Sequence, residues 1–503
     1  MSKQRPFLRG HGILMPLFSL DSKYGIGVMG EPAKKFIDFL SLCGCDMWQL
    51  LPLGPTGYGN SPYQCFSAFA GNSYFLNPEW FFKKGWIDSK LLKKFEAPNL
   101  GKVDYAYLFK TRKPLFGEIF SQFKRFSSEN QKREFETFCN RNAFWLYDYA
   151  VFSAIKEYFD NCGRADFPKF KLKSNEAVLF AEKNLKERIE FFLFLEYAFS
   201  EQWQEIREYA REKGVMLVGD IPIYVSDDSA DVWANKHLFQ LSCEGVPTSI
   251  AGVPPDIFSK SGQLWGNPLY NWEEHKGENF SWWKARISRQ AEFFDAIRID
   301  HFIGFCRYYS VPYDAKNAIN GEWRKAPGKH LTSAICDAAP NTKFIAEDLG
   351  PATREVHRLV KSTGFPGMKL MQFAFDGTDN PNMLHNIPKN SIVYTGTHDN
   401  QTAVGFFSSC DSKTKKLAGK YMNVKHNKLL ANAMIKECHK SRANTVIVPL
   451  YDYLGLDDSA RINTPGTTDN NWVWRINTNL SDDLAKEIYA IADTYKRVNP
   501  REE

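Results

Sequence analysis

The stretch that decides the fold of this chain is AIRIDH at residues 296–301, a short apolar run that ends in polar residues. Two further stretches have the same form: KFIAEDLG at residues 343–350 and IVYTGTHDN at residues 392–400. Each is typical of a short β-strand that gives way to polar residues, and the acids at these points are Asp300, Glu347 and Asp399. A barrel of parallel strands gathers its strand ends around one mouth, so we expect the three carboxylates to meet there.

Eight strand candidates occur along the chain, with helical stretches between most of them. They are Gly12–Leu17, Met47–Pro52, Val215–Asp220, Met368–Phe373, Val446–Val448 and short runs near Ile297, Phe344 and Ile392. The opening order of strand, helix and strand favours a parallel sheet, and Pro32 and Gly44 suit the two ends of the first helix. The pattern predicts the α/β class and a (β/α)8 TIM barrel.

The length of the chain indicates more than a plain barrel. Its 503 residues are about twice what such a barrel needs, which leaves either several domains or one barrel with large insertions. The alternation of strands and helices breaks at residues 54–210, which are mostly helical, and at residues 221–290, which are rich in Gly, Pro and Trp. We expect a single catalytic barrel over residues 1–503, with a helical subdomain and an active-site loop subdomain inserted in it.

Composition and charge exclude several classes of function. Charged residues make up 24% of the chain and hydrophobic residues 43%, which is typical of a soluble globular protein. The net charge of +6 is spread over 64 basic and 58 acidic residues without a long basic block, which argues against a nucleic-acid partner. No apolar run approaches the length of a membrane span, so we expect no membrane partner. Ten scattered cysteines and no recognisable secretory signal predict a cytoplasmic protein.

The cofactor motifs of the chain do not support a redox or a metal enzyme. GIGVMG at residues 25–30 fits G-x-G-x-x-G, but a dinucleotide fold needs an acid at the end of the second strand, and Asp46 precedes that strand. His301 and His398 stand beside acids, yet the chain contains neither H-x-H nor H-E-x-x-H, and catalytic zinc takes three well-placed ligands. We expect neither a cofactor nor a metal.

The neighbours of the three acids indicate different roles for them. Arg298 and Asp300 project to the same side of a strand, so the guanidinium would keep the carboxylate ionised; a structural ion pair is the alternative. Glu347 follows apolar residues, which would raise its pKa as a general acid requires. Its neighbour Asp348 must face the other way and is expected to cap a helix. Asp399 fits either a catalytic site or a polar turn.

Two aromatic loops accompany these acids. The first is YGNSPYQ at residues 58–64, and the second runs from AGVPPDIF at residues 251–258 to QLWGNP at residues 263–268. Sugar rings stack their C–H faces on aromatic side chains, while Asn, Gln and Asp bind hydroxyl groups; packing between loops is the alternative. Together with paired carboxylates, the loops favour glycoside chemistry.

Six further motifs stand out: LPLGPTG at residues 51–57, SPYQ at 61–64, GDIPIYV at 219–225, AGVPPD at 251–256, WGNP at 265–268 and RINTPG at 461–466. They resemble motifs of the 4-α-glucanotransferase (amylomaltase) family of the α-amylase superfamily. The matches, including the three acid-bearing stretches, run in order from Gly12 to Gly466. The resemblance implies a barrel with inserted subdomains and no separate C-terminal β-domain.

The resemblance also implies roles for individual residues. Asp300 would be the nucleophile, Glu347 the acid/base and Asp399 the stabiliser of the transition state, while Arg298 would orient Asp300. The residues expected to bind substrate are Ser61, Tyr63, Asp220, Gln263, Trp265, His398 and Asn463, with Tyr58 at a second, outlying glucan site. Gly252, Pro254 and Asp256 would belong to a flexible loop that covers the site.

The activity implied by the resemblance is transfer of a segment of an α-1,4-glucan to the 4-OH of an acceptor sugar. Maltooligosaccharides, amylose and glycogen would be the partners. A retaining mechanism would place the carboxyl groups of Asp300 and Glu347 about 5–5.5 Å apart. An α-glucan hydrolase of the same superfamily and a non-catalytic glucan-binding protein are the alternatives.

Overall fold

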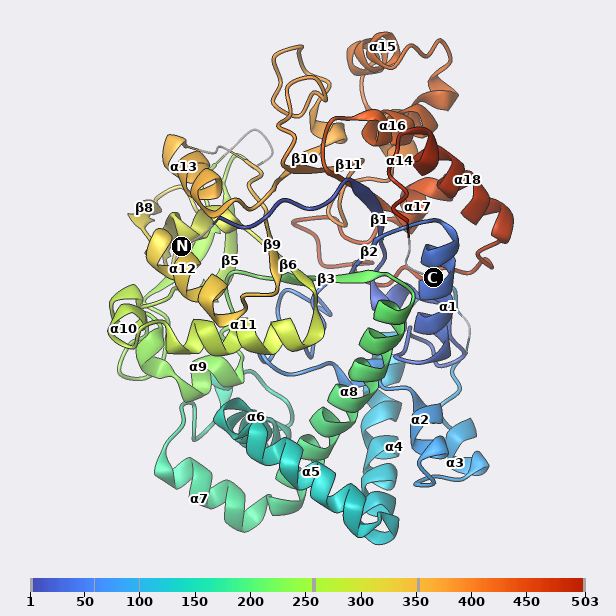
Figure 1. Ribbon diagram of the computed structural model, residues 1–503. Coiled ribbons are helices and arrows are strands. Elements are labelled where there is room, and N and C mark those ends of the chain that lie inside the picture. Colours follow the sequence, from blue (N-terminus) through green and yellow to red (C-terminus); the bar gives the residue numbers. More distant parts are fainter. Residues whose placement is uncertain (1–2, 58, 99, 256–258, 351–352, 501–503) are drawn as a thin grey trace.

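Eight parallel strands form a closed barrel in the computed structural model, which describes residues 3–57, 59–98, 100–255, 259–350 and 353–500 (Figure 1). In order around the barrel they are β1 (Gly10–Leu14), β2 (Met47–Gln49), β3 (Met216–Ile221), β6 (Ala296–Ile299), β9 (Lys343–Ala346), β10 (Gly367–Leu370), β11 (Ser391–Tyr394) and β12 (Thr445–Pro449). The order around the barrel is the order along the chain, and β12 pairs with β1 to close it. The predicted TIM barrel and all eight strand candidates are confirmed.

The barrel is filled by side chains rather than open. One cluster of buried residues includes a member from each strand: Leu14, Met47, Val218, Ala296, Ile345, Met368, Ile392 and Ile447. Five of the strands, β1, β2, β6, β11 and β12, are buried at every position. Strands of a parallel barrel are covered on both faces, by the interior and by helices, which explains why they appear in the sequence as short continuous apolar runs.

The first helix shows how local signals produce the alternation. Helix α1 (Glu31–Leu42) has Pro32 in its first turn, where the missing N–H costs nothing. Beyond its C-terminus Gly44 adopts φ 67°, and the Cys45 N–H donates to the Leu40 carbonyl at 2.9 Å. The chain then turns directly into β2. The other helices between later strands are α11 (Ser281–Phe293), α12 (Lys329–Ala338), α13 (Arg354–Thr363), α14 (Ala403–Ser409), α15 (Ser412–Tyr421) and α16 (Leu430–Lys440).

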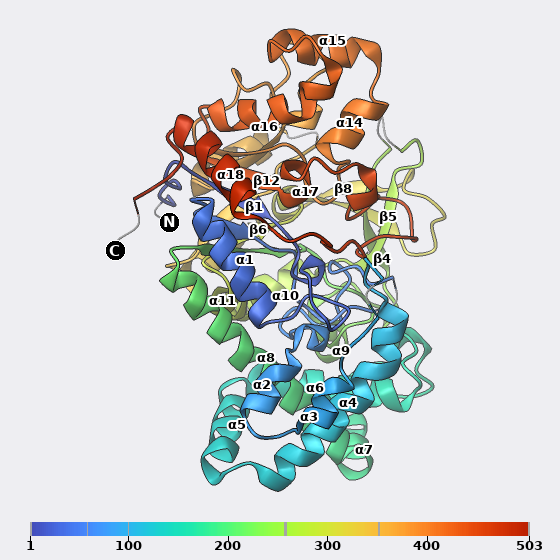
Figure 2. The ribbon, with the colours of Figure 1, turned by 90° about the vertical axis from the view of Figure 1, so that its right-hand side faces the viewer.

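The chain between β2 and β3 is helical, and it forms the lobe at the bottom of Figures 1 and 2. It contains α2 (Pro78–Lys83), α3 (Ser89–Lys93), α4 (Tyr105–Phe126), α5 (Glu129–Arg141), α6 (Ala143–Tyr158), α7 (Asn175–Asn184) and α8 (Lys186–Glu212). The long helix α8 contacts α4, α5, α6 and α7 and also contacts β3. It therefore joins this lobe to the barrel wall.

A second, four-stranded antiparallel sheet lies beside the barrel, in the order β5-β4-β7-β8. Strands β4 (Ser249–Val253) and β5 (Gln263–Pro268) belong to the second predicted insertion, which also holds α9 (Ala230–Ala234) and α10 (Trp272–Gly277). Strands β7 (Arg307–Pro312) and β8 (Glu322–Lys325) come from the segment after β6. The sequence interpretation did not anticipate this sheet, because its two halves are separated by a barrel strand and pair only in the folded chain.

The predicted covering loop needs a correction. Gly252 is not in a loop but in β4, where a Cβ would stand 2.4 Å from the Gln263 carbonyl oxygen. Glycine is needed there because it lets β4 and β5 approach closely. Pro254 directly follows β4, and Asp256 lies outside the described residues.

The C-terminal part of the chain completes the barrel without a further sheet. From residue 450 to residue 500, the described chain holds the helices α17 (Leu450–Tyr453) and α18 (Asp482–Thr494) and a short 3-10 helix, Asp458–Ala460, but no strand. In the part of the chain that the structure covers, no helix is both long enough and apolar enough to cross a membrane.

Candidate active site

Two of the three acids stand immediately after barrel strands, and the third stands in the loop after another. Asp300 follows β6, Glu347 follows β9, and Asp399 lies in the loop between β11 and α14. All three are therefore at the C-terminal end of the barrel, where barrel enzymes have their active sites. The backbone N–H of His301 donates to Glu347 Oε2 at 2.8 Å, which links the ends of β6 and β9 directly.

The buried guanidinium of Arg298 connects the carboxylate of Asp300 with that of Asp220. Arg298 is only 3% exposed, and its Nη2 lies 3.0 Å from Asp300 Oδ1. Its Nη1 donates to both oxygens of Asp220, at 2.7 and 2.6 Å. The Arg298–Asp300 ion pair exists as expected, but the Asp300 side chain remains 31% exposed. Asp300 is thus held beside a cation and is still accessible from the mouth.

Glu347 is in the opposite electrostatic situation. It is 8% exposed, and burial together with the charge of Asp300 raises its pKa to about 8. Its two oxygens accept hydrogen bonds from backbone N–H groups, from His301 and, at 3.0 Å, from Leu349. The His301 backbone adopts a left-handed conformation, φ 48°, at this point of the chain. A carboxyl group of this kind carries a proton at neutral pH and can act as a general acid.

The Asp348 carboxylate contacts residues of β10. The prediction that it caps a helix is wrong: α13 begins at Arg354, with Thr353 as its N-cap. Asp348 Oδ1 instead accepts from the backbone N–H of Met368 at 2.8 Å. Strands β9 and β10 share only the pair Gly367 and Ala346, so this carboxylate provides a further link between them.

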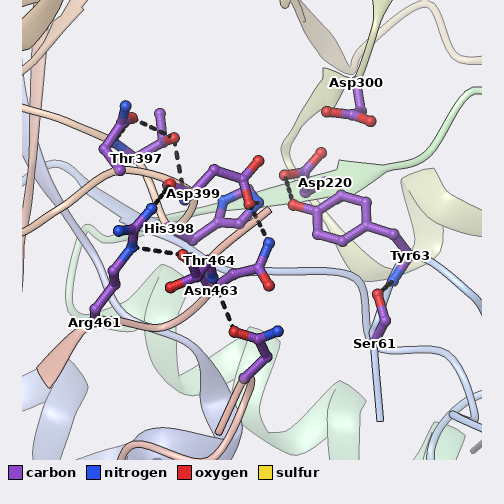
Figure 3. Close-up of polar contacts among 12 residues, drawn as sticks. Ser61, Tyr63, Asp220, Asp300, Thr397, His398, Asp399, Arg461, Asn463 and Thr464 are labelled. Carbon is purple, nitrogen blue, oxygen red and sulfur yellow. Dashed lines mark hydrogen bonds and ion pairs between the residues drawn. The ribbon is translucent and has the colours of Figure 1, made fainter. Parts of the chain in front are cut away.

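Asp399 is held in its charged form by two neighbours (Figure 3). Its Oδ1 accepts from Asn463 Nδ2 at 2.6 Å and lies 3.3 Å from His398 Nε2. Partial desolvation at the mouth opposes ionisation, but these two side chains outweigh it and lower the pKa of Asp399 to about 2. The Arg461 guanidinium also donates to the Asp399 carbonyl at 2.8 Å. With a side chain that is 44% exposed, Asp399 presents a permanent negative charge to the mouth.

Tyr63 brings the loop after β2 into the same group. Its hydroxyl donates to Asp220 Oδ2 at 2.8 Å, and its ring stacks on His398 with centroids 5.1 Å apart. Figure 3 shows the Tyr63 hydroxyl pointing at the Asp220 carboxylate. Ser61 Oγ accepts from the Tyr63 backbone N–H at 3.3 Å and so supports the turn.

The second sheet contributes Gln263 and Trp265, both on β5. The Trp265 ring meets the His301 ring edge-on, with centroids 4.8 Å apart, next to Asp300. The Trp265 indole N–H donates to Gln263 Oε1 at 3.3 Å. Gln64 Nε2 donates to Asn267 Oδ1 at 3.2 Å, which ties β5 to the loop that carries Tyr63.

The described residues among the predicted substrate-binding residues thus lie at the mouth of the barrel or on the sheet beside it. Tyr58, the residue expected at a second glucan site, lies outside the described residues. Sequence reasoning assigned no role to Trp472, whose ring contacts Tyr63. Its signal in the sequence is the run of polar residues that it follows. The His301 ring contacts Trp265.

Comparisons with known proteins agree with this geometry. The family model described as 4-alpha-glucanotransferase matches residues 15–481. A 4-alpha-glucanotransferase from Streptococcus pneumoniae is 39% identical over 497 residues, which are 98% of each chain, and one from Aquifex aeolicus is 41% identical over 93% of this chain and 96% of its own. The structure of an amylomaltase from Streptococcus agalactiae in complex with acarbose has a TM-score of 0.94 and 37% identity, covering 98% of this chain and all of that one.

The match covers almost the whole chain in sequence and in structure, and the barrel carries its acids where such enzymes have their active sites. This chain therefore belongs to the 4-alpha-glucanotransferase family.

Proposed function

We propose that Asp300, Glu347 and Asp399 perform the glucanotransferase reaction of this chain by a retaining double displacement. The observation that carries the proposal is the contrast between two acids at neighbouring strand ends. Asp300 lies 3.0 Å from the buried Arg298 guanidinium, whereas burial and the Asp300 charge raise the pKa of Glu347 to about 8. An ionised carboxylate beside a protonated one is the pair that a retaining mechanism needs.

The first displacement forms a covalent intermediate. A carboxylate oxygen of Asp300 attacks the anomeric carbon of an α-1,4-glucan, and Glu347 gives its proton to the departing 4-oxygen. The leaving sugar departs with that proton as its 4-OH, and the glycosyl group remains as an ester of Asp300 in the inverted configuration. The negative charge of Asp399 stabilises the positive charge that develops on the sugar ring.

The second displacement releases the product. Glu347, now ionised, removes the proton from the 4-OH of an acceptor sugar, and that oxygen attacks the anomeric carbon. The bond to Asp300 breaks, and the second inversion restores the α configuration. We propose that Arg298 orients Asp300 and that Ser61, Tyr63, Asp220, Gln263, Trp265, His398 and Asn463 bind the sugars.

Transfer rather than hydrolysis requires that water reach the intermediate less often than an acceptor sugar. We propose that the loop between β4 and β5, including Pro254 and Asp256, covers the intermediate in this way. Trp265, at the base of this hairpin, lies next to His301 and supports the proposal. A loop that admitted water would give a hydrolase, which is the alternative activity.

The substrates proposed are maltooligosaccharides, amylose and glycogen, all α-1,4-glucans. We also propose that residues 1–503 act as one catalytic unit, in which residues 54–210 and 221–290 are insertions. The barrel strands before, between and after these insertions support this arrangement. Ten free cysteine thiols support a reducing compartment, and we propose the cytoplasm.

Incubation with maltotriose separates the possible activities. Transfer gives glucose and a ladder of chains longer than maltotriose, hydrolysis gives only shorter chains, and an inert binding protein gives no change.

The replacement D300N should lower kcat by at least about 10³-fold while maltotriose still binds, because it removes the nucleophile and keeps the side-chain size. Retained turnover in D300N would disprove the assignment. In a crystal structure with acarbose, the Asp300 and Glu347 carboxyl groups should be about 5–5.5 Å apart; about 9 Å would contradict the mechanism.

A further inference from the structure

We propose that Asp452, through Thr395, is a positioning residue for the loop that carries His398 and Asp399. The loop joins β11 to α14, and Asp452 lies behind it on α17, directly after β12. Asp452 is only 3% exposed and makes none of its hydrogen bonds with the residues proposed to bind sugar. The proposal rests on the role proposed above for Asp399.

The carboxylate of Asp452 connects the two ends of this loop. Its Oδ2 accepts from the Thr395 hydroxyl at 2.5 Å, and its Oδ1 accepts from the backbone N–H of Ala403 at 2.7 Å. Thr395 and Ala403 are both fully buried. One carboxylate on α17 therefore fixes the distance between the two ends of the loop.

The same stretch of chain also holds the loop between its ends. The Tyr451 hydroxyl donates to the Thr397 carbonyl at 3.0 Å. Asp458 Oδ1 accepts from the Thr402 N–H at 3.0 Å, and its Oδ2 accepts from Gln401 Nε2 at 2.7 Å. Asp458 reaches this place only because residue 405 is glycine: a Cβ there would be 2.0 Å from Asp458 Oδ1.

These contacts end at the catalytic acid itself. The backbone N–H of Asn463 donates to the His398 carbonyl at 3.0 Å, and its side chain donates to Asp399 Oδ1 at 2.6 Å. The segment from Tyr451 to Asn463 therefore contacts the loop at several points along its length. A shift of the loop relative to this support would move Asp399 with respect to Asn463 and to the sugar.

Aspartate suits this position better than its amide. A carboxylate can accept from the Thr395 hydroxyl and the Ala403 N–H at the same time, through different oxygens, whereas asparagine has one acceptor oxygen. A buried carboxylate without a cationic partner is costly, and in the described part of the chain no cation is among the groups that shift the pKa of Asp452. Burial raises the pKa of Asp452 to about 7, and the hydrogen bonds from Ala403 and Thr395 oppose this rise.

The sharpest test is the isosteric replacement T395V, which removes the donor and leaves Asp452 bound to Ala403. We expect kcat for maltotriose to fall about tenfold or more while KM stays within about twofold, because a displaced Asp399 affects the transition state more than ground-state binding. T395S, which keeps the hydroxyl, should restore most of kcat. If kcat of folded T395V stayed within about twofold of the parent enzyme, the proposal would be overturned.

The matched control is T332V. Thr332 is also fully buried and donates its hydroxyl to the backbone, to the Gly328 carbonyl at 3.2 Å, but it lies on α12. Thermal unfolding of both variants measures any loss of folded enzyme, and kcat is compared per folded molecule. An equal loss of kcat in T332V and T395V would show a general effect of stability and would contradict a positioning role.

A double-mutant cycle with N463A tests whether the effect passes through Asp399. If Thr395 and Asn463 orient the same carboxylate, their combined loss of kcat should be smaller than the product of the single losses; independent effects would argue against the proposal. D399N in the same assay distinguishes the role proposed for Asp399 from the positioning role proposed for Asp452. High activity of D399N would remove the role proposed for Asp399, whereas inactive D399N with unaffected T395V would refute only the positioning role.

Discussion

At the scale of single residues, the cation Arg298 and the buried acid Glu347 have different roles in the site. Arg298 contacts both Asp220 and Asp300, and it leaves Asp300 accessible. Glu347 is held by backbone N–H groups in a buried position, near the charge of Asp300. A buried carboxyl group whose pKa is raised suits proton transfer, and an accessible carboxylate beside a guanidinium suits attack.

The raised pKa of Glu347 predicts a pH limit of activity. The first displacement needs protonated Glu347, so kcat should fall as pH rises above about 8. E347Q should lose about 10²–10⁴-fold in kcat and no longer show this limb. E196Q is the matched control, because Glu196 is another buried acid whose pKa burial raises to about 8, but it lies on α8 and accepts from Gly71. A kcat that stayed constant to about pH 10 would contradict the assignment.

The same shift predicts how stability depends on pH. Glu347 titrates near pH 8 in the folded protein and near about 4.3 when unfolded, so between these values the folded state binds more protons. The free energy of unfolding contributed by this group is therefore highest at low pH and falls as pH rises through that window. E347Q removes the dependence, and its melting temperature should exceed that of the parent increasingly from pH 5 to pH 9. Calorimetry would count against the shift if the difference were independent of pH.

At the scale of elements, the four-stranded sheet β5-β4-β7-β8 brings Trp265 to the catalytic end of the barrel. Strand β4 joins β5, which carries Trp265, to β7, which follows the Asp300 strand. Any change in the spacing of β4 and β5 therefore moves Trp265 with respect to His301 and Asp300. The spacing depends on Gly252, which has no room for a side chain.

The replacement G252A should consequently reduce both activity and stability. The added Cβ meets the Gln263 carbonyl at 2.4 Å, and relief of this overlap should cost about 1–3 kcal/mol and lower kcat/KM for maltotriose. G277A is the control, since a Cβ at the end of α10 meets nothing within 4 Å. Denaturant unfolding and initial rates measure the two effects. Similar behaviour of G252A and G277A would show that the close approach is not needed.

At the scale of the whole molecule, one end of the barrel carries the active site and the other end contributes to stability. The C-terminal ends of strands β6, β9 and β11 lead to the acids, while the N-terminal ends of β1 and β12 are held by Arg497. This fully buried guanidinium donates to the carbonyls of Gly10, Asn444, Ser441, Ala443 and His439. It ties the beginnings of β1 and β12, and so the closing seam of the barrel, to the last turn of the chain.

Removal of this tie should affect stability without affecting the chemistry. R497A removes the Arg497 hydrogen bonds to five carbonyls, of which Ser441, Ala443 and Asn444 keep another donor. We therefore expect the free energy of unfolding to fall by on the order of 3 kcal/mol. The half-life of thermal inactivation should shorten, while kcat per folded molecule stays unchanged because the site is at the other end of the barrel. The exposed K486A variant controls for loss of a surface charge. A selective fall in kcat would show that the two ends are coupled.

Much of the barrel and the positions of its acids could be predicted from the sequence. Each barrel strand is a local apolar run, and Asp300 and Glu347 directly follow two of them. The partners of Asp348 and the pairing of β4 with β7 could not be predicted. A local pattern shows that a residue ends a strand, but several partners satisfy the same carboxylate or strand edge equally well.

The sequence by itself determined the order of the strands, the type of fold and the family, since these depend on local periodicity and on motifs spread along the whole chain. The tertiary structure alone decided which groups meet at the mouth. The Tyr63 hydroxyl reaches Asp220 across 157 residues of chain, and Asn463 reaches Asp399 across 64. The charge states of the acids depend on such contacts and on burial, which exist only once the barrel has closed.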